Sequence, residues 1–242
     1  MKLAIMQPYL FPYIGYFQLL NAVDRFVLFD DVAYINRGWI NRNRILVNGQ
    51  AHLFTVPLHN ASQNVLIKDL ELAVDDKWRA KFLRTLDLAY RRAPHYAPTM
   101  EIVTAVVNLR TSHLRDWLLV SLQRIHAYLE IPTRLIESSE SCANRQLRGQ
   151  ERILDICRQE HADHYLNPIG GTDLYDHAAF AANGVRLSFV KAKPGSYPQF
   201  GAPFVPWLSI IDVLMFNPPQ AIKVGFLREY ELEEAHERIP PP

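Results

Sequence analysis

The sequence predicts an α/β fold in which a mostly parallel sheet lies between two layers of helices. Short apolar runs alternate with segments of helical periodicity at both ends of the chain, whereas residues 75–131 show helical periodicity alone. The 242 residues are 49% hydrophobic and carry a net charge of only +1, so the chain can bury a core. Because single cores extend to about 250–300 residues, we expect one domain over residues 1–242, with residues 75–131 as a helical lobe.

The first sixty residues predict a strand, a short helix, a second strand and a β-hairpin. Residues 2–6 and 26–30 are apolar runs that end in polar residues, and helical spacing of apolar side chains lies between them. Asn48 and Gly49 separate two further strand patterns, over residues 41–47 and 51–57. An Asn-Gly pair in that position is typical of a hairpin turn.

Helices are expected over residues 75–93, 100–108 and 112–129, the last with Ser112 as its N-cap. The alternation then returns, with strands expected over residues 133–137, 163–167 and 185–190 and helices over 150–159 and 172–182. Residues 193–207 are too aromatic for a linker and predict a packed loop beside a site. Residues 228–242 predict a solvated end. This order is typical of a three-layer, Rossmann-like sheet with a hairpin and a helical insertion.

Composition excludes several classes of protein. Two cysteines are too few for a disulfide framework, and their spacing matches no zinc site, so we expect no metal centre of that kind. Balanced charge argues against a nucleic-acid-binding surface. The first residues do not form a signal peptide, and no apolar run is long enough to span a membrane. We therefore expect a cytoplasmic protein with a small-molecule substrate.

The first candidate site follows the first predicted strand. In an open α/β sheet, ligands bind at the carboxyl ends of the strands. Gln7, Tyr13 and Tyr16 offer hydrogen bonds there, and Gly15 allows a ligand to approach the backbone at a helix N-terminus, which suits an anion. The alternative is that the aromatic rings fill the top of the sheet and that Gly15 serves close packing.

Asp30 and Asp31 end the second predicted strand. Either carboxylate could accept a proton from a substrate or hold Mg²⁺ through water. Because side chains alternate along a strand, only one of the two is expected to face a site. Aspartates at strand ends also form turns and helix caps, so a structural interpretation stays open.

Residues 36–44 are rich in arginine and asparagine around one tryptophan. Guanidinium groups bind oxyanions through two hydrogen bonds and stack on flat rings, so this run favours phosphate or nucleotide recognition. The candidate residues are Trp39, Asn41, Arg42, Asn43 and Arg44. The alternative is an exposed hairpin strand whose arginines lie in water.

The last candidates lie in the second half of the chain. Gly170 and Gly171 follow a predicted strand and could form an anion-binding nest, although a glycine pair before a helix is also an ordinary turn. Further polar residues stand in apolar surroundings: Tyr197, Gln199, Ser209 and Asp212. Ser209 has the position of an N-cap, whereas Asp212 is a candidate buried functional acid.

Several of these motifs resemble the WbqC-like proteins of bacteria. They are residues 6–17, 24–31, 39–44, 197–200 and 208–214, so the resemblance spans nearly the whole chain. The family is often encountered among genes for O-antigen and other surface polysaccharides. The resemblance therefore implies work on sugar nucleotides or their amino-sugar derivatives, and it marks these motif positions as site residues without assigning catalytic roles.

A second similarity is to the HIGH-type nucleotidyltransferase fold, in which His-x-Gly-His between the first strand and the first helix holds ATP phosphates. Residues 13–16 have that placement and spacing, with tyrosine at both histidine positions. Neutral phenols cannot replace the charge of the imidazoles, so adenylyl transfer by that mechanism is not expected. The similarity implies an anion pocket reused for a pyrophosphate or a pantetheine-bearing donor.

Our leading hypothesis is an enzyme of O-antigen (lipopolysaccharide) or other surface-polysaccharide biosynthesis that transfers an acyl or aminoacyl group to the amine of a nucleotide-linked sugar. Arg42, Arg44 and the turn at Gly15 would hold phosphates, and one of the three aspartates would accept the proton. The donor would be coenzyme A or an acyl-carrier protein. The alternatives are an ATP-dependent amide ligase or nucleotidyltransferase with Mg²⁺ at Asp30 or Asp31, and a non-catalytic protein that binds nucleotide sugars.

Overall fold

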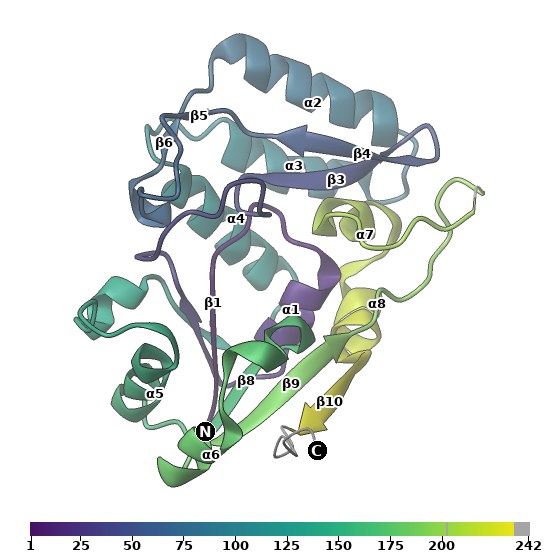
Figure 1. Ribbon diagram of the computed structural model, residues 1–242. Helices are drawn as coiled ribbons and strands as arrows, with labels where there is room; N and C mark the ends of the chain where they lie inside the picture. Colours follow the sequence, from purple (N-terminus) through teal and green to yellow (C-terminus); the bar gives the residue numbers. More distant parts are fainter. Residues whose placement is uncertain (202, 235–242) are drawn as a thin grey trace, which may run out of the picture.

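The computed structural model describes residues 1–201 and 203–234 and confirms the α/β fold with a mostly parallel sheet (Figure 1). The main sheet has six strands, in the spatial order β10 (Tyr230–Glu234), β9 (Arg186–Ala192), β8 (His164–Pro168), β1 (Lys2–Met6), β2 (Arg25–Leu28) and β7 (Arg134–Ile136). Neighbours from β9 to β7 run parallel, and β10 runs antiparallel to β9.

Helices cover both faces of this sheet, because alternate side chains of its central strands enter two different cores. Ala4 and Phe26 belong to the core that contains α1 (Ile14–Asn21), whereas Leu3 and Val27 belong to the core that contains α5 and α6. The bounds of these last two helices are Gly149–Gln159 and His177–Ala182. The three expected layers are therefore present.

The strand order reverses direction beside β1. From β1 the chain proceeds through α1 to β2 on one side, whereas from β8 it proceeds through α6 to β9 on the other side. In sheets of this kind the reversal opens a crevice at the carboxyl ends of the two diverging strands. The topology thus marks the region above β1 and β8 as the place for a ligand.

The hairpin and the helical middle form the upper part of the molecule (Figure 1). β3 (Arg42–Val47) pairs with β4 (Gln50–Thr55), and the expected turn residues Asn48 and Gly49 have φ values of 50° and 76°. Positive φ at both positions is what a two-residue hairpin turn needs. Three helices follow after the short pair β5 (Leu58–His59) and β6 (Glu71–Leu72): α2 (Asp76–Tyr90), α3 (Tyr96–Val107) and α4 (Leu114–Tyr128).

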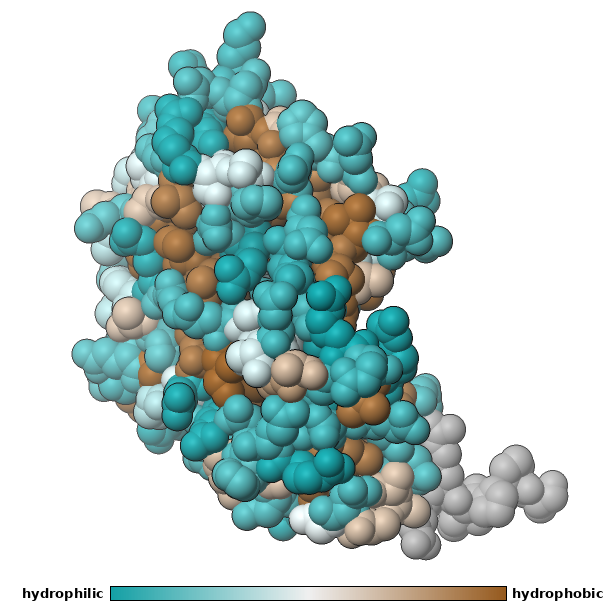
Figure 2. All heavy atoms as spheres, turned by 90° about the vertical axis from the view of Figure 1, so that its left-hand side faces the viewer, coloured by the Kyte–Doolittle hydropathy of each residue, from teal (hydrophilic) through white to brown (hydrophobic). Residues whose placement is uncertain are grey.

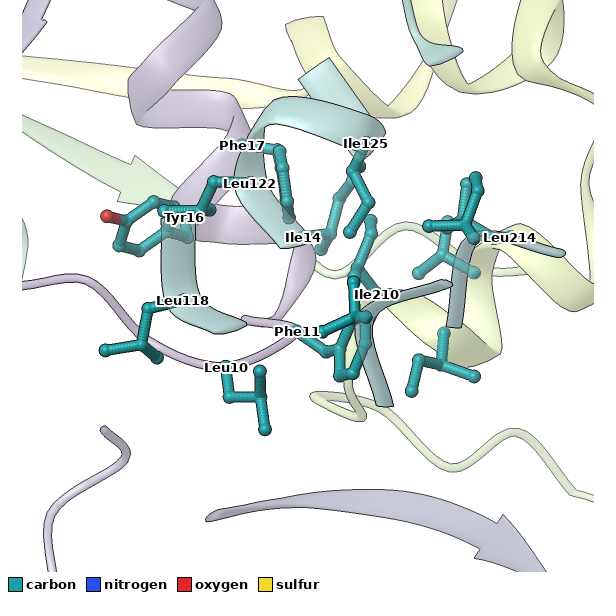
Figure 3. Close-up of a cluster of buried hydrophobic side chains, with 14 of the residues drawn as sticks. Leu10, Phe11, Ile14, Tyr16, Phe17, Leu118, Leu122, Ile125, Ile210 and Leu214 are labelled. Carbon is teal, nitrogen blue, oxygen red and sulfur yellow. The ribbon is translucent and has the colours of Figure 1, made fainter. Parts of the chain in front are cut away.

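A continuous apolar core joins the helical middle to the sheet. Figure 3 shows side chains of α1, α4 and α7 (Ile210–Phe216) meeting, among them Phe17, Leu122 and Ile210, all fully buried. Helix α8 (Pro219–Val224) follows α7 and contributes the buried Ile222. Among the described residues, no helix is long and apolar enough to cross a bilayer.

Two local predictions are wrong. Helix α4 begins at Leu114 after His113, without a side-chain cap, so Ser112 is not its N-cap. The helix expected over residues 172–182 is shorter, because Ile169–Leu174 form a 3₁₀ turn and α6 starts only after Asp176, which accepts a hydrogen bond from the amide of Ala178.

The expected solvated end contains the edge strand β10. Its carboxylates pair with Lys191 of β9 and with Lys193 directly after β9, with 3.0 Å from Lys191 to Glu233 and 2.7 Å from Lys193 to Glu231. Charged side chains along an edge strand hide the strand pattern and also protect the edge from pairing with another chain. The remainder of the predicted end, residues 235–242, lies outside the described residues.

Candidate functional site

A pocket of about 510 Å³ lies at the carboxyl ends of β1, β8 and β9. The strands contribute Met6, Pro168, Val190 and Ala192 to its lining, and Gly170 contributes from the turn after β8. The volume is typical of a small-molecule site. The pocket therefore occupies the crevice that the strand order predicts.

Aromatic side chains form much of the rest of the wall. The rings of Tyr13 and Trp207 meet edge to face, with centroids 5.8 Å apart, and Tyr9 and Trp39 complete the aromatic part of the lining. Trp39 and Trp207 are each 40% exposed, which places their rings at the open side. Trp207 has a φ of 60°, an unfavourable backbone conformation for a bulky residue. These rings offer flat surfaces to a flat ligand group.

Arg44 brings one positive charge to this wall. Its guanidinium lies 5.1 Å from the centroid of the Trp39 ring, and its buried Nε has no hydrogen-bond partner among the described residues. No carboxylate lines the pocket within residues 1–201 and 203–234. A buried polar atom without a partner is uncommon in native structures and calls for a ligand or water. Arg44 is thus a cation left available for an anion.

The neighbouring polar residues of the hairpin segment have internal partners. Arg42 also stacks on Trp39, at 5.6 Å, but its Nε donates to the carbonyl of Gly38 over 2.7 Å. Asn41 accepts from Tyr34 and donates to a backbone carbonyl, and neither Asn41 nor Arg42 lines the pocket. The residues of this segment that line the pocket are Trp39, Asn43 and Arg44. Nδ2 of Asn43 donates to the carbonyl of Phe11 over 2.7 Å.

The candidate residues that follow β1 also include some that line the pocket and some that do not. Tyr13 lines the pocket, whereas Gln7 is half-buried outside its lining. At Gly15 an added Cβ would lie 2.6 Å from the Cβ of Ala192 and closer still to the ring of Tyr13. The structure therefore favours the close-packing interpretation of this glycine.

Tyr16 is buried, and its hydroxyl has no hydrogen-bond partner among the described residues. Its ring centroid lies 5.7 Å from that of Tyr9, a lining residue that the sequence analysis did not select. Burial raises the pKa of Tyr9 to about 12, so its phenol stays protonated and can donate a hydrogen bond. Tyr9 and Tyr16 belong to the same motif, residues 6–17, and this motif is the signal in the sequence that indicates Tyr9.

The two candidate glycines of the second half differ. Gly170 lines the pocket, and a Cβ at this position would meet no atom within 4 Å. At Gly171 a Cβ would lie 2.6 Å from the side-chain nitrogen of Asn167. Gly170 therefore leaves space for a ligand, whereas Gly171 serves a tight turn.

Asp212 lies outside the pocket lining and is fully buried. Its carboxylate accepts hydrogen bonds from the hydroxyls of Tyr90 (2.8 Å) and Tyr197 (2.7 Å) and from Nε2 of Gln199 (2.6 Å). Burial raises the pKa of Asp212 in spite of these donors. The Tyr90 hydroxyl also accepts from the amide of Leu46 in β3. This network joins α2, the loop before α7, and the hairpin.

Ser209 caps α7, as expected. Its hydroxyl accepts from the amide of Ile211 (3.3 Å) and donates to the carbonyl of Phe11 (2.7 Å). Its own amide donates to the carbonyl of Arg44 over 2.8 Å. Ser209 and Asp212 therefore connect the elements around the pocket, and neither is part of its lining.

Asp30 and Asp31 lie beyond the end of β2, and neither is part of the pocket lining. Arg115 donates to Asp30 over 2.9 Å, and both oxygens of Asp31 accept from Arg152 over 2.7 Å. Serine hydroxyls at positions 138 and 139 donate to the same two carboxylates. The geometry favours structural roles for both aspartates, because each already has a cation and a hydroxyl as partners.

Most of the chain matches known proteins. The model of the WbqC-like protein family matches residues 7–224. The chain belongs to the WbqC-like protein family. This WbqC-like chain is 30% identical over 226 residues to the uncharacterized protein Rv1507c of Mycobacterium tuberculosis, which covers 89% of the chain and 93% of that protein. No solved structure gives a significant match.

Proposed function

We propose that this WbqC-like protein binds a nucleotide-linked amino sugar in the pocket above β1 and β8 and modifies it for surface-polysaccharide biosynthesis. The observation that carries the proposal is Arg44, whose guanidinium has no acidic partner in the described part of the chain and lies in a pocket with mainly aromatic and apolar walls. A phosphate group supplies the missing acceptor, because guanidinium binds phosphate through charge-assisted hydrogen bonds.

The rest of the lining suits the other parts of such a ligand. The rings of Tyr13 and Trp207 offer stacking surfaces for a nucleobase, and the hydroxyls of Tyr9 and Tyr13 can donate to sugar or phosphate oxygens. Gly170 leaves the backbone of the turn after β8 open to close approach. The apolar floor of strand residues excludes water and strengthens the contact with Arg44.

The reaction we propose is transfer of an acyl or aminoacyl group from a thioester to the sugar amine. The amine nitrogen attacks the acyl carbon, the new carbon–nitrogen bond forms as the carbon–sulfur bond breaks, and the amine proton passes to the leaving thiolate. The thiolate can accept this proton, so the step requires no carboxylate in the pocket. Holding amine and thioester together supplies much of the rate. In this proposal Asp30, Asp31 and Asp212 keep structural roles.

Arg44 provides the direct test, with Arg42 as a matched control on the same strand and the same tryptophan. We expect Arg44→Met to weaken binding of uridine- or thymidine-diphosphate amino sugars by about ten- to a hundredfold, the worth of a hydrogen bond to a charged group. Arg42→Met should have little effect, because the Nε of Arg42 is occupied by Gly38. Isothermal titration calorimetry measures both. No binding to any of these nucleotide sugars, or equal losses in the two variants, would contradict the proposal.

A non-catalytic binding protein is the second candidate, and one observation favours it. Among the residues that the structure describes, the pocket lining contains no carboxylate, thiol or imidazole. Mass spectrometry of the nucleotide sugar after incubation with acyl-coenzyme A or an acylated carrier protein separates the two candidates. A mass increase that depends on Arg44 supports the transferase, and unchanged sugar with intact binding supports the binding protein.

A further inference from the structure

Helix α2 carries a row of exposed cations, which we call the basic stripe. It consists of Lys77, Lys81 and Arg84 of the helix and of Arg91, the residue directly after it, with Leu88 among them. The spacing places all five side chains on one face of the helix. Leu88 is 60% exposed. Since a helix rises 1.5 Å per residue, the stripe is about 21 Å long.

The cations of the basic stripe form no ion pair among the described residues. The carboxylates of α2 have other partners, with Asp76 accepting from Arg110 over 2.6 Å and Asp87 accepting from the hydroxyl of Tyr96 over 2.8 Å. The chain as a whole has a net charge of only +1. This face is therefore a local concentration of unpaired positive charge, and its complement is an acidic surface.

The stripe ends next to the loop that borders the pocket. The guanidinium of Arg92 lies 5.7 Å from the ring of Phe200, in the loop of residues 193–207. The last residue of α2, Tyr90, donates to Asp212 in α7. The same loop leads to Trp207 in the pocket wall. One end of the stripe therefore lies next to the loop that carries Trp207.

We propose that the basic stripe docks an acidic helical protein, and that this protein is the carrier that presents the acyl donor. The proposal rests on the proposed function, which requires a thioester donor. Carboxylates spaced along one helix face would pair with the four cations, and Leu88 would enter an apolar notch of the partner. In protein interfaces a few side chains that enter pockets of the partner carry most of the binding energy.

The orientation of α2 favours a protein partner over a membrane surface. A helix that lies in a membrane interface inserts its apolar face between the lipids. The apolar face of α2 is directed into the protein, where Phe82, Leu86 and Tyr90 are buried. Figure 1 places α2 at the top of the molecule, and the top of Figure 2 carries mainly hydrophilic side chains.

The test reverses the charge of the stripe. We expect the variant with Lys77→Glu, Lys81→Glu, Arg84→Glu and Arg91→Glu to bind a holo acyl-carrier protein at least about tenfold more weakly than the unaltered chain, with the largest difference at low ionic strength. Leu88→Ser should weaken binding without changing its salt dependence. The control variant has the same net charge and alters exposed cations elsewhere: Lys2→Glu, Arg124→Glu, Arg134→Glu and Arg148→Glu.

Biolayer interferometry with immobilised carrier protein measures these affinities, and vesicles containing phosphatidylglycerol provide the membrane comparison. Retained affinity in the stripe variant, an equal loss in the control variant, no carrier binding by the unaltered chain, or stripe-dependent binding to vesicles instead of the carrier would each overturn the inference. Nucleotide-sugar binding, measured on the same stripe variant, should be unchanged. If that binding depends on Arg44 while the carrier result is negative, the docking inference fails and the proposed function stands.

Discussion

The two halves of the sheet's carboxyl edge treat their charged residues in opposite ways. Beyond β2, the carboxylates of Asp30 and Asp31 have arginine and serine partners drawn from α4, α5 and the segment after β7. Above β1 and β8, Arg44 faces a pocket whose lining, as far as the structure describes it, contains no carboxylate. The charged groups of the first half have partners within the chain, whereas the Nε of Arg44 in the second half has none among the described residues.

This difference identifies a site more reliably than the kind of residue does. Adjacent aspartates at the end of a strand suggest chemistry in the sequence, yet their partners make them cross-links between elements. A single arginine on a hairpin is a weaker sequence signal, yet its buried atom without a partner is the stronger indication. The partners of a polar group, rather than its identity, separate a structural role from a binding role.

The largest expected effect on stability concerns the carboxylates beyond β2, which have partners within the chain. Arg152→Met leaves the buried carboxylate of Asp31 without its main partner and should lower the free energy of unfolding by about 3–5 kcal/mol. The double variant with Asp31→Asn should recover part of this loss, because it removes the uncompensated charge. Arg158→Met, on the same helix but largely exposed, should cost about 1 kcal/mol or less. Urea unfolding measures all three, and an equal cost for Arg152 and Arg158 would refute the structural role.

A smaller effect distinguishes two glycines beside the pocket. Gly15→Ala should lower the free energy of unfolding by about 1–3 kcal/mol, because the added Cβ would lie 2.6 Å from the Cβ of Ala192. Alanine in place of glycine ordinarily stabilises a helix, so a loss of stability would itself indicate close packing at this position. Gly170→Ala should change stability by less than about 0.5 kcal/mol, since no atom lies within 4 Å of the new Cβ. Thermal unfolding compares the two, and a neutral Gly15→Ala variant would restore a ligand-contact role for Gly15.

The smallest effect, a change of about 1–2 kcal/mol in the free energy of unfolding, concerns Asp212. Its hydrogen-bond partners are neutral rather than cationic. Burial raises its pKa above 3.8, so the folded chain binds this proton more tightly than the unfolded chain. The stability of the unaltered chain relative to Asp212→Asn should be greatest below pH 3.8 and should fall as the pH rises through the raised pKa. Asp155 should behave in the opposite sense, because hydrogen bonds from Asn144 and Gln159 lower its pKa.

For Asp155→Asn, the advantage of the unaltered chain should be present above pH 3.8 and be lost as the pH falls through the lowered pKa. Urea unfolding at a series of pH values measures both dependences. Parallel pH profiles for the two variants would contradict this prediction, because burial raises the pKa of Asp212 whereas hydrogen bonds lower the pKa of the far less buried Asp155.

The sequence predicts elements well where the pattern is local. The first strand and the hairpin follow from apolar runs and one Asn-Gly pair, whereas β10 was missed because charges along an edge strand resemble a solvated end. Strand order is not contained in such patterns. The reversal between β1 and β8, which creates the crevice, becomes visible only when the strands are assembled.

The candidate site shows the same limit. Tyr13, Trp39, Asn43, Arg44 and Gly170 were selected from sequence and line the pocket. Asp30 and Asp31 lie outside the lining, and their arginine partners are distant along the chain: Arg115 is 85 residues from Asp30, and Arg152 is 121 residues from Asp31. No spacing rule joins residues so far apart.

The backbone of Trp207 has a practical consequence for anyone who engineers this protein. A left-handed conformation costs a bulky residue about 1–3 kcal/mol, and glycine at the same position would be free of that strain. Selection for heat resistance alone would therefore favour the loss of this indole. A screen that scores only survival at high temperature would enrich variants that are more stable but lack the Trp207 ring at the opening of the pocket.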